Sequence, residues 1–157
     1  MQSSQHGKVE SGLKSRSQKI QTLVELAQIE EEKAVKTLAA VQQQYQQHLA
    51  QLDQLKSYVD EYAQSTVGQG RVIQPIQMLS TQAFVAKLHQ AIQVESEKTG
   101  RLAEVVEHAR QVWLEKRTRL KALQKLRDKL KQSEQAGLDK REQRFLDELS
   151  ALQHGRK

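Results

Sequence analysis

An apolar repeat that averages 3.5 residues runs through the first half of the chain. Read in alternating steps of four and three, the stripe consists of Ile20, Val24, Ala27, Glu31, Ala34, Leu38, Val41, Tyr45, His48, Leu52, Leu55, Val59 and Tyr62. Only Glu31 and His48 interrupt its apolar character. Such a repeat keeps one face of a slightly under-wound helix toward a partner helix, so it indicates a coiled-coil seam.

The second half of the chain resumes the same spacing with more polar interruptions. Its stripe consists of Val85, Leu88, Ile92, Glu95, Thr99, Leu102, Val106, Ala109, Trp113, Lys116, Leu120, Leu123, Arg127 and Leu130. Gly100 lies inside this stripe and should cost about 1 kcal/mol relative to alanine, but nothing around it signals a second hinge. With one tryptophan and 37% hydrophobic residues, two long helices fit the composition better than a thick globular core.

One strong break separates the two stripes. Residues 65–70 read Ser-Thr-Val-Gly-Gln-Gly, and Pro75 follows. Glycines adopt turn conformations readily, and a proline biases the residue before it away from helix. We therefore predict an all-α fold: a single antiparallel coiled-coil hairpin over residues 1–157, with helices at about 14–64 and 80–152 and a hinge at 65–79. Ser15 and Gln18 form a plausible capping box at the first helix start.

Complementary pairs across the two stripes predict the register. Placing Tyr62 opposite Val85 sets the small Ala34 against Trp113, and it sets Glu31 against Lys116 and His48 against Thr99. Opposite charges at seam positions help to fix register. In this register Ser15 lies opposite Gln132, so roughly twenty residues of the second helix have no partner, about 30 Å of helix. That segment carries the apolar residues Leu138, Phe145, Leu149 and Leu152.

Chemistry-bearing motifs are scarce. The chain has no cysteine, no apolar run resembling a signal peptide and no segment long enough to span a membrane, so we expect a cytoplasmic protein. Only Glu104 and His108 share a helix face at metal-ligand spacing, and two ligands do not form a closed site. The pair Gly68 and Gly70 lacks the lysine of a phosphate loop. We expect no metal, no cofactor and no enzymatic activity.

The net charge of +6 favours acidic partners. Basic residues gather in one run, with Asp128 as its single acid: Lys116, Arg117, Arg119, Lys121, Lys125, Arg127, Lys129 and Lys131. A solvated helix face explains such a run as well as a binding surface does. Among binding partners, an acidic protein is favoured first and nucleic acid second. Aromatic residues that stack on bases are absent from it, which argues against single-stranded nucleic acid, whereas phosphate contacts with a duplex remain open.

Near the break, aromatic residues widen the stripes. Tyr58 flanks the first stripe, while Phe84 and Ala91 flank the second. These residues are explained either by ordinary packing beside the seam or by an exposed strip, and exposed apolar strips mark protein-binding surfaces.

Four features in order resemble the flagellar FliJ family. Residues 51–62 (QLDQLKSYVDEY) resemble the segment before the loop in that family, and a Gly-x-Gly loop follows. Phe84-x-x-x-Leu88-x-x-Ala91-Ile92 and then Trp113-x-Glu115-Lys116-Arg117-x-x-x-Leu120 come next. Each motif alone is common in coiled coils, but the ordered set covers the chain from about Leu23 to Leu130.

The resemblance implies a non-enzymatic component of the flagellar type III protein export apparatus, peripherally associated with the inner membrane only through that apparatus. In that family a coiled-coil stalk links the export ATPase FliI to the cytoplasmic part of the gate protein FlhA and escorts export chaperones. The residues matching the family's gate-binding positions are Gln51, Leu55, Tyr58, Tyr62, Phe84, Leu88 and Ala91. Glu95 stands where the family can have histidine, which leaves its role open.

The family's helix ends enter the ATPase ring, so the unpaired apolar residues Leu138, Phe145, Leu149 and Leu152 become the expected ATPase-binding set. Two alternatives stay open from the residues alone. One is the equivalent stalk or scaffold protein of a virulence type III system. The other is a nucleic-acid binder that uses the basic run from Lys116 to Lys131.

Overall fold

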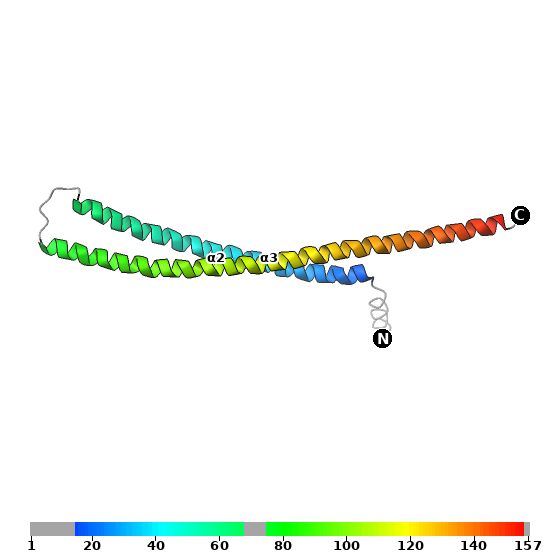
Figure 1. Cartoon of the computed structure of the whole chain (residues 1–157), viewed down its shortest axis with the longest axis horizontal. Helices are drawn as coiled ribbons and strands as arrows, with labels where there is room; N and C mark the ends of the chain where they lie inside the picture. Colours follow the sequence, from blue (N-terminus) through cyan, green and yellow to red (C-terminus); the bar gives the residue numbers. More distant parts are fainter. Residues whose placement is uncertain (1–14, 68–74, 156–157) are drawn as a thin grey trace, which may run out of the picture. The chain divides into compact units, whose positions relative to one another are not determined.

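The computed structural model describes residues 15–67 and 75–155. Helix α2 spans Arg16–Val67 and helix α3 spans Pro75–His154. The two helices pack against each other in antiparallel directions (Figure 1), and the described residues contain no strand. The all-α helical hairpin predicted from the two stripes is therefore confirmed.

The break is narrower than the sequence indicated. Residues 65–67 belong to α2 and residues 75–79 belong to α3, although both stretches were assigned to the hinge. Proline has no backbone N–H and a fixed φ that suits the first helical position, so Pro75 begins α3 rather than delaying it. The Gly68-Gln69-Gly70 part of the predicted hinge lies outside the described residues.

The predicted capping box forms at the start of α2. The backbone N–H of Ser15 donates to Oε1 of Gln18 at 3.1 Å, and the backbone N–H of Gln18 donates to Oγ of Ser15 at 3.3 Å. These reciprocal bonds satisfy two donors that the first helical turn leaves without backbone partners.

A residue of α3 completes this helix start. Glu134 accepts hydrogen bonds from the backbone N–H of Ser17 at 3.1 Å and from its Oγ at 2.6 Å. These side-chain and backbone bonds from Ser17 lower the pKa of the Glu134 carboxyl from its ordinary value of 4.5, because they favour the ionised form. The negative charge also lies near the positive end of the α2 dipole.

The observed burial follows the predicted seam. Every residue of the second stripe is buried or half-buried, and so is every residue of the first stripe except Tyr62. Numbering heptads with Val24 and Val85 at position a places Ala27 and Leu88 at position d. The core is thin, and small residues such as Ala27, Ala34 and Ala109 are among its most buried members.

The chain consists of two compact units, each containing part of both helices. The central unit is Lys33–Leu114, and the terminal unit combines the chain up to Glu32 with the chain from Glu115. Within the terminal unit, Ser17 contacts Glu134, Arg127 Nη1 donates to Gln21 Oε1 at 2.9 Å, and Lys116 pairs with Glu30 at 3.1 Å.

Within the central unit, His48 Nδ1 lies 2.5 Å from Glu95 Oε1, and the rings of Tyr62 and Phe84 lie 4.8 Å apart. These contacts and those of the terminal unit all lie within four residues, about one helical turn, of the predicted register. Where the register sets Glu31 against Lys116, Lys116 pairs with Glu30, and His48, which the register sets against Thr99, pairs with Glu95 one turn away.

Long polar side chains explain the difference. The carboxylate of Glu95, one turn from Thr99, lies within reach of His48, whereas the Thr99 hydroxyl donates to the carbonyl of Glu95 at 2.7 Å on its own helix. For the predicted Ala34 and Trp113 pair, Ala34 is buried and Trp113 is half-buried. This burial is what seam positions require.

The two sides of the helix pair can be distinguished from these contacts. In an antiparallel pair, a residue at g lies beside a d residue of the partner helix, and a residue at e lies beside an a residue. Lys116 at d pairs with Glu30 at g, and Tyr62 at d packs on Phe84 at g. The g positions of both helices therefore lie on one side of each unit, here called the g side.

Candidate functional site

The residues expected from the resemblance to bind the gate protein share one side of the central unit. Leu55, Tyr62 and Leu88 occupy d positions, and the other four occupy g positions: Gln51, Tyr58, Phe84 and Ala91. All seven therefore lie on the g side. We call them the aromatic strip.

The aromatic residues of the strip lie at the surface rather than in the core. Tyr58 and Phe84 are each 43% exposed and Tyr62 is 39% exposed. Tyr62 and Phe84 pack together at an interplanar angle of 43°, and the Tyr58 hydroxyl accepts a hydrogen bond from Gln54 Nε2 at 3.1 Å. Such contacts restrict the rings while leaving much of their area open to a partner.

Two members of the strip contribute little open surface. Leu88 is buried and Leu55 is half-buried. Both lie at d positions, where packing across the seam covers the side chain.

The opposite side of the same region carries a shallow apolar groove of about 390 Å³. Its lining residues come from both helices and lie mostly at a and e positions: Val59, Tyr62, Ala63, Met78, Thr81, Gln82, Val85 and His89. The sequence did not predict this groove, because Met78 falls in the predicted hinge and only Val59, Tyr62 and Val85 of the lining belong to the predicted stripes. Tyr62 contributes to both surfaces, because its d position lies in the seam, between the g side and the opposite side of the helix pair.

The predicted unpaired segment of α3 is present. All residues from Gln135 to Gly155 are exposed, and the large apolar ones are Leu138, Phe145, Leu146, Leu149 and Leu152. Phe145 is 61% exposed and Leu152 is 67% exposed. Leu138, Phe145, Leu149 and Leu152 recur at spacings of seven, four and three, so they lie on one side of the helix. We call these four residues the C-terminal apolar line.

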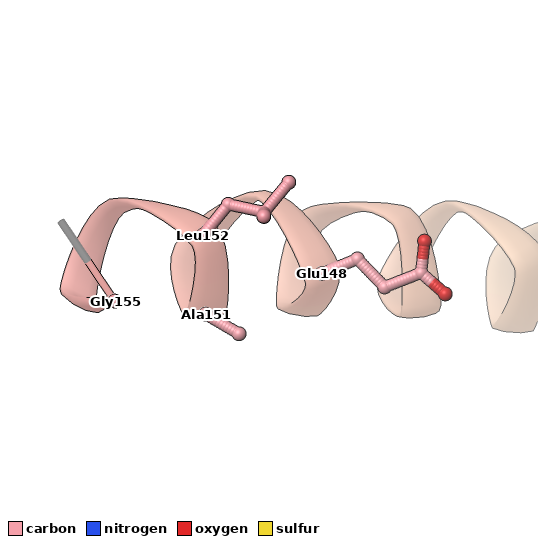
Figure 2. A pocket seen from close by; sticks show the side chains of 4 residues that line it. All are labelled: Glu148, Ala151, Leu152 and Gly155. Atoms are coloured by element: carbon pink, nitrogen blue, oxygen red, sulfur yellow. The ribbon is translucent and has the colours of Figure 1, made fainter.

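The last turns of α3 form only an open surface at this line. Figure 2 shows Glu148, Ala151, Leu152 and Gly155, which border a shallow depression on the helix. The helix ends where the N–H of Gly155 donates to the carbonyl of Ala151 at 2.9 Å. No part of α2 that the structure describes covers the line, so its apolar side chains are available to another molecule.

The pair of His48 and Glu95 was not predicted. Their side chains are 22% and 15% exposed, and they meet across the seam of the central unit. The carboxylate of Glu95 gives His48 a partner. The signal in the sequence was two polar seam residues within one turn of each other in the predicted register.

Residues with metal-ligating chemistry do not converge within the described parts of the chain. Glu104 and His108 are exposed on α3, and no group of three or more ligands was found among the described residues. The described helices also include none that is long and apolar enough to cross a membrane.

Comparison with known proteins gives one match. Neither the curated proteins nor the solved structures compared contain a match. The profile of the family described as "Flagellar FliJ protein" matches residues 16–157, which is most of the chain and includes both helices. The chain belongs to the flagellar FliJ family, and it is therefore a component of the flagellar protein export apparatus.

Proposed function

We propose that this chain is a non-enzymatic coiled-coil stalk that links the export ATPase ring to the membrane export gate and escorts substrate chaperones. Family membership supports a place in the export apparatus. The observation that carries the finer proposal is the presence of two separate exposed apolar surfaces. The aromatic strip lies in the central unit, and the C-terminal apolar line lies in the terminal unit.

The aromatic strip is the proposed contact with the cytoplasmic part of the gate protein. Tyrosine and phenylalanine side chains dominate the binding energy of many protein interfaces because they bury large area at low entropic cost. Three such rings lie on the g side, and two of them are already in contact. Little ordering of these side chains would be needed on binding.

Tyr58→Ala combined with Phe84→Ala tests this assignment. Both side chains lie at g positions, so we expect weaker gate binding with helicity largely retained. The matched control is Ile76→Ala with Leu79→Ala, which removes two more exposed apolar side chains that lie outside the strip. Circular dichroism accompanies the pull-down. Unchanged gate affinity in a folded double variant would exclude the strip, and collapsed helicity would show that the rings are core residues.

The C-terminal apolar line is the proposed contact with the export ATPase. An exposed helix with a continuous apolar side matches a receptor that accepts a helix face in an apolar groove. Deletion of the segment after Gln135 should weaken association with the isolated ATPase and leave gate binding unchanged. Phe145→Asp with Leu149→Asp should reproduce the deletion, because both aspartates would be buried in an apolar receptor.

Two controls separate apolar from electrostatic contact. Gln143→Asp with Ser150→Asp adds the same charges on the opposite side of the same helix, so binding should persist. Reversal of Arg141 and Arg144 should matter less than the changes at the apolar line, since exposed ion pairs contribute under about 1 kcal/mol. If only the charge reversal abolishes ATPase binding, the contact is electrostatic and the apolar line is not its basis.

A further inference from the structure

The positive charge of the chain is concentrated in one section of the terminal unit. Residues 16–28 of α2 and 119–131 of α3 lie opposite each other in the observed register. Together they hold two acids, Glu25 and Asp128, against eight basic residues: Arg16, Lys19, Arg119, Lys121, Lys125, Arg127, Lys129 and Lys131. This section alone therefore carries a net charge of +6, which equals the net charge of the whole chain.

Neighbouring acids offset little of this charge. Glu134, which accepts hydrogen bonds from Ser17 and lies near Lys131, can balance only one of the positive charges. Lys116 pairs with Glu30, which lies outside the section, and Arg127 pairs with the adjacent Asp128. The other acids of α2 in this unit, Glu31 and Glu32, also lie beyond residue 28. Holding many like charges on two packed helices is unfavourable, so the arrangement points to a role other than stability.

Exposed leucines accompany the basic residues on one side. Leu23 is 42% exposed, Leu26 is 55% exposed and Leu126 is 43% exposed. Leu23 and Leu126 occupy g positions, as do Arg16 and Arg119, whereas Leu26, Lys19 and Lys129 occupy the adjacent c positions. Because the g positions of both helices share one side of the unit, these seven residues form a single surface, which we call the basic leucine face.

We propose that the basic leucine face binds the surface of an anionic phospholipid membrane. Basic residues attract anionic headgroups, and leucines between them can enter the boundary between headgroups and acyl chains. Two helices lying side by side offer a broad, nearly flat surface, as a membrane requires. Duplex nucleic acid would use the same cations but would leave the exposed leucines without a partner. The face is distinct from both surfaces of the proposed function, so this inference does not depend on it.

Vesicle co-sedimentation of the full chain tests the proposal. We expect binding to vesicles of phosphatidylcholine with phosphatidylglycerol, weakening with added salt, and no binding to phosphatidylcholine alone. Each basic residue near an anionic surface contributes about fivefold in affinity. Lys19→Glu with Lys129→Glu should therefore weaken binding by more than about tenfold.

The matched control places the same charge change elsewhere in the section. Lys121→Glu with Lys131→Glu alters the b and e positions of α3, which face away from the basic leucine face. Because salt at about 0.1 M screens charges beyond about 10 Å, this control should weaken binding by at most about threefold. Equal losses in the two variants would mean that net charge alone attracts the chain, and the proposed face would be wrong.

A leucine variant separates the membrane from other anionic partners. Leu23→Gln with Leu126→Gln keeps the charge, and we expect it to weaken vesicle binding while circular dichroism shows an intact helix pair. The Phe145→Asp with Leu149→Asp variant should bind vesicles as the unaltered chain does, unless the C-terminal apolar line is the lipid-binding site. Absence of binding to anionic vesicles at low salt, or leucine-independent binding that duplex DNA competes away, would overturn the proposal.

Discussion

Glu134 is the residue that joins the start of α2 to α3. Both of its carboxylate oxygens accept hydrogen bonds from Ser17, and these bonds lower its pKa. A group whose pKa is lower in the folded than in the unfolded chain contributes stability above the unfolded value of 4.5, and the contribution is lost as pH falls through the folded value. Acid should therefore loosen this junction.

We predict that Glu134→Gln lowers the stability of the hairpin at neutral pH. The amide cannot supply two acceptor oxygens to Ser17, and it removes the negative charge near the α2 start. Urea unfolding of both proteins at a series of pH values provides the measurement. The stability difference should shrink below pH 4.5 and nearly vanish once Glu134 is protonated in the folded chain. A difference independent of pH would mean that shape, not charge, accounts for the effect.

The pair of His48 and Glu95 gives a second prediction at the residue scale. The two side chains are partly shielded from solvent, so we expect a coupling free energy of about 0.5–3 kcal/mol. A double-mutant cycle with His48→Ala and Glu95→Ala, read by urea unfolding at neutral pH, measures it. Additive effects of the two substitutions would show that the contact contributes nothing to stability.

At the scale of the element, α3 is one continuous helix through both of its internal glycines. An added Cβ at Gly100 or Gly137 would meet no atom within 4 Å. The glycines therefore lower helix stability without serving close packing. Gly100 does not end the helix. This agrees with the sequence, which signalled no second hinge there.

We predict that Gly100→Ala stabilises the chain by about 1 kcal/mol, because alanine removes backbone freedom from the unfolded state and fits without strain. Thermal unfolding followed by circular dichroism measures the change. Gly137→Ala is the matched control in the unpaired part of α3, where helix content should rise with little effect on the main transition. A lowered midpoint for Gly100→Ala would indicate that the helix needs a flexible point there.

The apolar stripes predicted the elements and the seam, but not the polar partners. The apolar repeat places residues such as Val24 and Leu88 in the seam between the helices, where both are buried. Glu95 and Glu134 reach their partners through long side chains that can point toward either neighbouring turn. Their choice depends on three-dimensional distances that spacing along the chain does not specify. The groove beside Met78 was not predicted, because the hinge was expected to extend to residue 79 whereas α3 begins at Pro75.

At the scale of the whole molecule, the two helices differ in how much of their length is paired. Nearly all of α2 that the structure describes lies against α3, whereas α3 beyond Glu134 is exposed on every side. Isolated helices of this length are only marginally stable in water. Packing therefore supports the first part of α3 much more than its last part.

We predict faster amide hydrogen exchange in residues 138–152 than in residues 20–59. Addition of the export ATPase should slow exchange in 138–152 if the C-terminal apolar line is its contact. Mass spectrometry of peptides from the intact chain gives the measurement, with the buried Leu52 region as the internal reference. Equal protection of the two regions in the free chain would contradict the difference in packing.

The unequal pairing also determines which insertions and deletions the gene can tolerate. Within the paired parts, adding residues to one helix shifts its polar and apolar positions past those of the other, so only matched additions to both helices preserve the seam. Beyond Glu134, α3 has no such constraint from α2. Its length can change in a single mutational step, which lets the reach of this segment be adjusted while the hairpin stays as it is.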